Sequence, residues 1–140
     1  MELTRLLSKT IQWHYDRGTI NGATDWTQSG KLLEEFIELI AAQYYEKAPE
    51  HIANTMHEMI DDLLLRGRIK SVSFDDRESA KLDAVGDMMV VLANIAERNQ
   101  SSLETCLSIA YNEIKDRKGR LVNGNFYKES DLDATGNIKQ

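Results

Sequence analysis

Five carboxylates in two segments have the type and spacing that a metal site requires. Glu34, Glu35 and Glu38 lie within about one helical turn of one another, and Asp83 and Asp87 are four residues apart. Like charges at these spacings repel in water. A bound divalent cation such as Mg²⁺, which prefers oxygen ligands, would turn this unfavourable interaction into a favourable one. We therefore expect two helices to hold one or two cations between them, and an exposed acidic face is the alternative for the glutamates.

The segment 83–96 is apolar around most of its helical circumference, apart from one narrow polar strip. At about 100° per residue, Asp83, Asp87 and Asn94 fall within roughly 40° of one another. A helix this apolar is normally buried, and a buried carboxylate is costly unless a cation or hydrogen-bond donors meet it. The strip predicts a metal ion or a basic partner. The structural alternative places Asp83 in a first helical turn and Asp87 in an ion pair.

A basic group closes the last expected helix. It comprises Lys115, Arg117 and Lys118, with Asn112 one turn earlier. Arg binds phosphate in a bidentate manner and Lys acts as a point charge. An acidic metal cage with a basic clamp is what phosphoryl or nucleotidyl chemistry needs. The alternative is structural, because the helix dipole favours cations at a C-terminus.

Three polar or aromatic residues near the start of the chain are weaker candidates for contacting a base. Trp13 could stack on it, Gln28 could hydrogen-bond to its edge, and His14 lies beside Trp13. A Trp near a helix end is more often part of a core. The sequence contains no Glu-x-x-His and no Gly-x-x-x-x-Gly-Lys, which argues against a di-iron bundle and a P-loop NTPase.

Helical periodicity predicts an all-α bundle of about five helices that position these residues. They are expected at about 2–17, 27–47, 49–66, 77–98 and 101–118, the last opened by a capping box at Ser101-x-x-Glu104. Cys106 falls on the apolar stripe of that last helix and is expected in the core. Residues 18–26 read as a loop, and Asn123-Gly124 predicts a short hairpin. We expect one domain over residues 1–120 and a tail over 121–140.

Composition narrows the functional classes. The chain has 140 residues, a net charge of −6 and one cysteine, which excludes an internal disulfide and disfavours a nucleic-acid polymer as partner. No apolar run is long enough for a membrane span, and no signal-peptide pattern opens the chain. We therefore expect a cytoplasmic protein without a membrane partner.

Taken together, three motifs resemble the MazG-like group, the all-α nucleoside triphosphate pyrophosphohydrolases related to dimeric dUTPases and phosphoribosyl-ATP pyrophosphatases. The resemblance covers roughly residues 10–120. The motifs are Gln28-x-x-Lys31-x-x-Glu34-Glu35-x-x-Glu38, Asp83-Ala-Val-Gly-Asp87 running into Asn94, and Asn112-x-x-Lys115-x-Arg117. The stretch from Asn112 to Gly124 resembles phage-type members, whose location would be the host cytoplasm.

The resemblance implies Mg²⁺-dependent hydrolysis of a (d)NTP to (d)NMP and pyrophosphate, for nucleotide-pool cleansing or adjustment. Mn²⁺ is a possible substitute for Mg²⁺. Glu35, Glu38 and Asp87 match the metal ligands of the group, and Asp83 is a candidate fourth. Glu34 is a candidate to orient the water. Residues matching the nucleotide and phosphate contacts are Asn94, Asn112, Lys115 and Arg117, with Lys118 as a further candidate. The resemblance also implies a homodimer or homotetramer.

Two departures from the group's pattern bear on the metal site. Ala84 stands where the group has a glutamate, three residues before Asp87, so Asp83 would have to substitute for it. The gap from Glu38 to Asp83 is long and contains the extra helix expected around 49–66. The rival interpretations are a non-catalytic helical oligomerisation or interaction module, and the same fold acting on phosphoribosyl-ATP or an alarmone.

Overall fold

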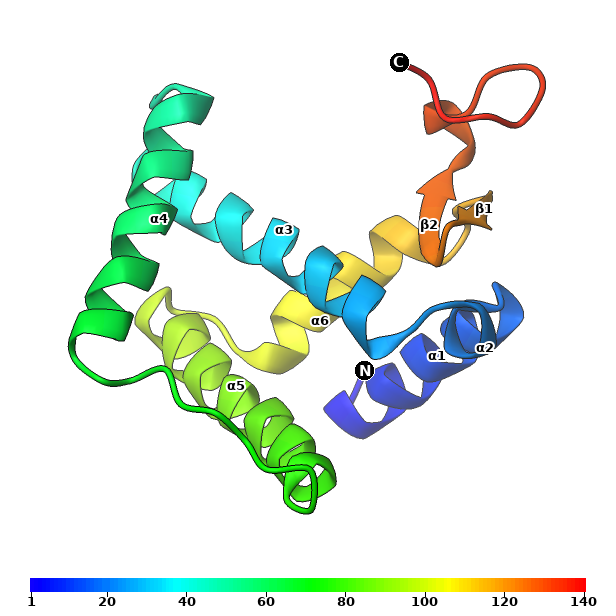
Figure 1. Ribbon diagram of the computed structural model, residues 1–140. Helices are drawn as coiled ribbons and strands as arrows, with labels where there is room; N and C mark the ends of the chain where they lie inside the picture. The colour runs from blue at the N-terminus through cyan, green and yellow to red at the C-terminus, as the bar shows by residue number, and fades with distance from the viewer. The chain divides into compact units, whose positions relative to one another are not determined.

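The structure is a computed structural model that describes all 140 residues, and it is mostly helical (Figure 1). The prediction of an all-α chain with a short C-terminal hairpin is confirmed. Its elements are α1 (Leu3–Asp16), α2 (Thr19–Gly22), α3 (Asp25–Gln43), α4 (Pro49–Leu65), α5 (Arg77–Arg98), α6 (Leu103–Ile114), β1 (Gly119–Val122), β2 (Asn125–Lys128) and a final 3₁₀ turn (Glu129–Asp131). A helix that crosses a bilayer needs a longer uncharged apolar run than any of these contains.

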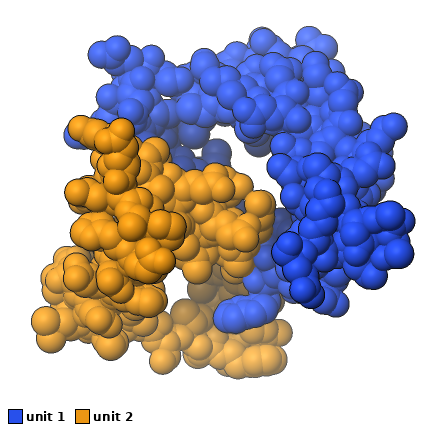
Figure 2. Space-filling view, turned by 90° about the horizontal axis from the view of Figure 1, so that it is seen from above, with its two compact units in different colours: residues 1–28, 82–140 blue, residues 29–81 orange.

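The chain divides into two compact units, which Figure 2 colours separately. The first comprises residues 1–28 and 82–140, and the second comprises residues 29–81. The boundaries fall inside α3 and α5, so each of these helices has its first residues in one unit and the remainder in the other.

The core of the first unit lies where α1 meets α6. Leu6 and Trp13 are seven residues apart, which places both on one face of α1, and they are 2% and 8% exposed. The Trp13 indole N–H donates to the Ile114 carbonyl over 2.8 Å, and its ring makes an edge contact with Phe126. One tryptophan therefore joins the first helix, the end of the last helix and the hairpin.

The hairpin after α6 follows from its turn sequence. Asn123 and Gly124 have φ angles of 53° and 81°, the left-handed pair that a two-residue type I′ turn requires. The turn sets the pairing of Leu121 with Phe126 and of Gly119 with Lys128. Gly119 has no room for a side chain, because a Cβ there would run into the Tyr127 carbonyl. The predicted hairpin is confirmed, with its register fixed by these residues.

Several expected boundaries are wrong by a few residues. The expected loop at 18–26 contains the short helix α2, entered through Gly18 at a φ of 71°. The next helix starts at Asp25 and stops at Gln43, and Glu46 beyond it has a φ of 62° that a helix cannot contain. The last helix is capped by Ser102, whose hydroxyl accepts from the Thr105 N–H, and not by Ser101. Cys106 is exposed and not in the core.

The second unit contains most of α3 and all of α4, which starts at Pro49 as expected. Proline suits this position because the first helical N–H has no partner to lose. Only Ile40 and Met56 of this unit are buried. Four large apolar side chains of α4 are exposed, namely Met59, Ile60, Leu63 and Leu64.

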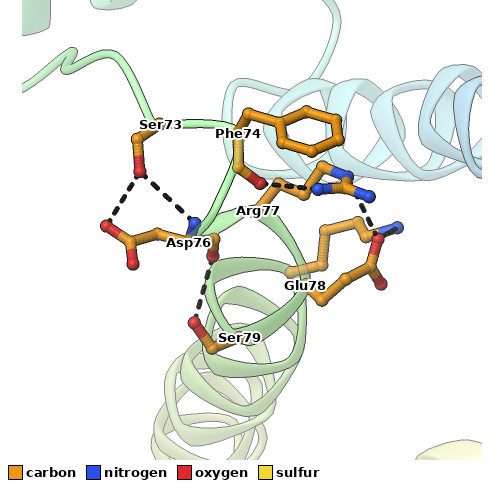
Figure 3. A network of polar contacts seen from close by, with 7 residues as sticks. Ser73, Phe74, Asp76, Arg77, Glu78 and Ser79 are labelled. Atoms are coloured by element: carbon orange, nitrogen blue, oxygen red, sulfur yellow. Dashed lines mark hydrogen bonds and ion pairs between the residues drawn. The ribbon is translucent and has the colours of Figure 1, made fainter.

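A local network fixes the start of α5 (Figure 3). The Ser73 hydroxyl accepts from the Asp76 backbone N–H and donates to its carboxylate, while the Ser79 hydroxyl donates to the Asp76 carbonyl. The Arg77 guanidinium lies 3.6 Å from the Phe74 ring centroid and donates to the Phe74 carbonyl. Because α5 starts at Arg77 as expected, Asp83 lies in the second turn, where the helix dipole no longer favours an acid.

Candidate functional site

The glutamates of α3 are exposed, and a lysine of the same helix pairs with two of them. The Lys31 ammonium lies 3.1 Å from Glu34 and 3.4 Å from Glu35. Partial burial alone would lower the pKa of Lys31, but the hydrogen bonds and negative charges of the two glutamates raise it above its ordinary value. Neither a hydrogen bond nor an ion pair engages the Glu38 side chain. Lys31 is a contributor that the sequence reasoning did not assign, although its i, i+3 and i, i+4 spacing is visible.

The acidic strip of α5 is also solvent-exposed. Asp83, Asp87 and Asn94 are all exposed, and no hydrogen bond or ion pair engages the two aspartate side chains. The expectation that this apolar helix is buried is wrong, since only Ala96 of α5 is buried. The carboxylates of the strip are therefore not compensated by a basic partner within the first unit. The ion pair considered for Asp87 is absent.

The donor chemistry fits Mg²⁺, but a complete cage is not assembled within either unit. Glu34, Glu35 and Glu38 belong to the second unit, whereas Asp83 and Asp87 belong to the first. No group of three or more His, Cys, Asp or Glu side chains is arranged to hold a metal ion. Each helix alone presents carboxylate oxygens at one-turn spacing, the ligand type that Mg²⁺ takes.

The basic residues after α6 lie beyond the helix and not on it. The helix ends at Ile114, Lys115 is its C-cap, and Arg117 and Lys118 lie in the turn before β1. The expected continuation of the helix through Lys118 is wrong. Lys115 and Lys118 are exposed, Arg117 is half-buried, and Asn112 is exposed on the last turn of α6. The three cations are close in sequence on one turn, as a phosphate clamp would need.

Arg17 holds this basic turn in place, and the sequence reasoning did not identify it. Its guanidinium donates to the Lys115 carbonyl over 3.0 Å and to the Arg117 carbonyl over 2.9 and 3.0 Å. It also lies 4.6 Å from the Trp13 ring centroid, a cation–π contact. Its position just after the end of α1 carries no sequence signal for a partner about 100 residues away.

The three candidates for base contact occupy different environments. Trp13 is buried with its N–H used in the core, so its ring is not free to stack on a ligand. Gln28 is exposed on α3. A nearby indole, Trp26, is 85% exposed and is better placed than Trp13 for stacking.

The half-buried His14 has its tautomer set by Thr19. The Thr19 hydroxyl donates its one hydrogen to the His14 carbonyl, so it accepts from His14 Nδ1 at 2.6 Å. The Nε2 lone pair of the neutral ring is then available to a ligand. Burial lowers the pKa of His14 below its ordinary value, which favours this neutral form.

A small cleft in the first unit brings two of the predicted site residues together. It has a volume of about 120 Å³, below the roughly 300 Å³ of sites for drug-sized ligands. Its ammonium and guanidinium groups outnumber its one carboxylate, and a phosphate group would fit its charge. The lining residues are Lys9, Gln12, Trp13, Asp16, Arg17, Tyr111 and Lys115.

Comparisons with known proteins assign this chain to no family. No protein-family model matches the chain, and no curated protein and no solved structure matches it either.

Proposed function

We propose that the protein hydrolyses a nucleoside triphosphate to the monophosphate and pyrophosphate with Mg²⁺ as cofactor. One observation carries the proposal. Two helices rich in apolar side chains each present acidic side chains one turn apart, and Glu38, Asp83 and Asp87 among them make no hydrogen bond or ion pair within their own units. Carboxylates one turn apart repel one another and so destabilise their helix slightly. A divalent cation bound to them would remove this repulsion.

In this proposal Glu35, Glu38, Asp83 and Asp87 hold Mg²⁺ or Mn²⁺. Bound there, the ion would lower the pKa of water and neutralise phosphate oxygens. Glu34 orients the water, whose oxygen attacks the α-phosphorus while the bond to the α–β bridging oxygen breaks. The water proton passes to a carboxylate, and pyrophosphate leaves.

The basic turn and the polar residues bind the rest of the nucleotide in this proposal. Lys115, Arg117 and Lys118 hold the phosphates, with Arg17 keeping their backbone in place. Asn94 and Asn112 contact sugar or phosphate, and the base is met by His14 Nε2, Gln28 and the neighbouring Trp26.

The proposed fold is a MazG-like bundle acting in the cytoplasm on the nucleotide pool. Lys31 bears on this proposal, because its ammonium forms an ion pair with Glu35, one of the proposed metal ligands. A cation bound at Glu35 would compete with this ammonium for the carboxylate. Glu38 is not paired with Lys31, so we propose that a cation binds to Glu38 before it binds to Glu35.

Pyrophosphate release from a panel of dNTPs and NTPs with Mg²⁺ tests the proposal. We expect pyrophosphate and not orthophosphate, with loss of at least about a hundredfold in Asp87→Asn and in Glu38→Gln, because each removes a charged ligand. Glu97→Gln is the matched control. It also removes one carboxylate from α5, about 15 Å along the axis from Asp87, and should retain activity.

Two results would contradict the proposal. Orthophosphate as the product would indicate a different bond cleavage. No turnover of any nucleotide by the folded protein, together with no shift in melting temperature on adding Mg²⁺, would favour the non-catalytic interaction module.

A further inference from the structure

The cleft in the first unit is lined by residues of α1 and of the end of α6, two helices that contact each other. Lys9 and Asp16 are seven residues apart on α1, and Tyr111 and Lys115 are four residues apart at the end of α6. Helical spacing places each pair on one face of its helix. Arg17, the residue after α1, also lines the cleft. Polar and charged side chains therefore reach the cleft from both helices.

The cleft is positively charged, although the net charge of the chain is −6. It is lined by two ammonium groups, one guanidinium and a single carboxylate, that of Asp16. Asp16 forms no ion pair with these cations, and its carboxylate accepts a hydrogen bond over 2.8 Å from the neutral amide of Gln12. The positive charge of the cleft is therefore not neutralised from within, so the cleft would attract an anion.

Several hydrogen-bond donors of the cleft have no acceptor. The ammonium groups of Lys9 and Lys115 and the hydroxyl of the half-buried Tyr111 make no hydrogen bond or ion pair. The Arg17 guanidinium uses Nε and Nη2 for the Lys115 and Arg117 carbonyls, which leaves both N–H groups of Nη1 without an acceptor. A phosphate group accepts charge-assisted hydrogen bonds from such donors in several directions at once.

The helix dipole accounts for only some of these cations. The carbonyls at the end of α6 carry partial negative charge, which would repel an anion, but Arg17 donates to the Lys115 and Arg117 carbonyls and offsets that repulsion. Lys9 lies about two turns before the end of α1, and the dipole acts only within the last turn of a helix. Its ammonium therefore has no structural role at a helix end.

We infer that this cleft binds a phosphate group, carried by the free ion or by a small phosphate monoester. Its volume of about 120 Å³ equals the share of roughly four water molecules in the liquid, which suits a phosphate group and excludes a whole nucleotide. Lys9, Lys115 and Arg17 hold the charge of the phosphate, and the Tyr111 hydroxyl donates to one of its oxygens. Of these side chains only Lys115 holds phosphate in the proposed hydrolysis, and no metal takes part.

The first test is a calorimetric titration of the full-length protein in EDTA with inorganic phosphate or glycerol 3-phosphate, at an ionic strength held constant with sodium chloride. We expect one phosphate group per chain. Binding of glycerol 3-phosphate identifies a phosphate monoester as a ligand, whereas binding of inorganic phosphate alone identifies the free ion. No binding of either probe at up to roughly 10 mM would overturn the inference. Because no metal or nucleoside triphosphate is present, the result is independent of the proposed hydrolysis.

The second test compares charge-matched variants of α1. Lys9→Gln removes an ammonium from the cleft, and Arg5→Gln removes a cation one turn earlier, at an exposed position that does not line the cleft. We expect Lys9→Gln to weaken phosphate binding about tenfold, because it loses a charged donor, and Tyr111→Phe to weaken it about threefold. Arg5→Gln should weaken it less than about twofold.

Two results of this comparison would contradict the inference. An unchanged affinity in Lys9→Gln would place the phosphate outside the cleft. Equal weakening by Lys9→Gln and Arg5→Gln would show a response to total charge and not to a site. Both side chains are exposed, so both variants should fold, and their melting temperatures without phosphate check this.

Discussion

The α1–α6 pair and α5 belong largely to the same unit, yet they differ in almost every physical respect. In the pair, Leu6 and Trp13 are buried, and Arg17 and Trp13 donate hydrogen bonds to carbonyls about 100 residues away. In α5 only Ala96 is buried, and the aspartates have no partners. The pair has the contacts of a core, whereas almost all of the large apolar side chains of α5 are exposed.

This difference separates the contacts that stabilise the first unit from the proposed metal ligands. The residues that hold the first unit together are the partners of Trp13 and Arg17, and none of them is a proposed metal ligand. The proposed ligands on α5 destabilise their helix slightly, since Asp83 and Asp87 repel each other at i, i+4 spacing. Substitutions in the two regions should therefore affect different measurements.

The largest effect on stability is expected for Trp13→Ala. It removes a buried indole and leaves the Ile114 carbonyl without its donor, so we expect a loss of about 3–5 kcal/mol in the free energy of unfolding. Urea denaturation at one fixed protein concentration measures it. Tyr15→Ala on the same helix is the control, because Tyr15 is 56% exposed and should cost less than about 1 kcal/mol. Equal losses would show that α1 does not pack as described.

The sequence predicted the helices better than the contacts between them. The helix at Arg77–Arg98 and the turn at Asn123-Gly124 were predictable because periodicity and φ-positive residues are local signals. The unpredicted features depend on distant groups. The Arg17 contacts with the carbonyls after α6, and the contact of the Trp13 ring with Phe126, have no local sequence signature.

The candidate site shows the same limit. The one-turn spacing of Glu35 and Glu38, and of Asp83 and Asp87, could be deduced from the sequence because helical spacing fixes it. The pairing of Lys31 with Glu35 is equally local. The expected burial of α5 and of Cys106 is wrong, because an apolar stripe is a local pattern and does not specify which other elements pack against it.

A smaller effect is expected from pH, through His14 in the packed region. Burial lowers the pKa of His14 below the ordinary 6.5, so the unfolded chain takes up the proton at a higher pH than the folded chain does. This contribution to stability is complete above pH 6.5 and declines as the pH falls through the folded pKa. His14→Asn keeps an N–H donor for Thr19 without titrating. Melting curves from about pH 7.5 to 5.5 should converge for the two proteins as the pH falls, and parallel curves would contradict the assignment.

The smallest effect, and the sharpest contrast with the packed region, is expected for Asp83→Asn on α5. Removing one of two like charges at i, i+4 should raise the stability of the metal-free protein by about 0.2–0.5 kcal/mol. Saturating Mg²⁺ should reverse the order, because the wild type gains stability by mass action and the variant gains less. Melting curves in EDTA and in Mg²⁺ measure both. A variant that is less stable than the wild type in EDTA would mean that Asp83 has a stabilising partner, and α5 would then resemble the α1–α6 pair after all.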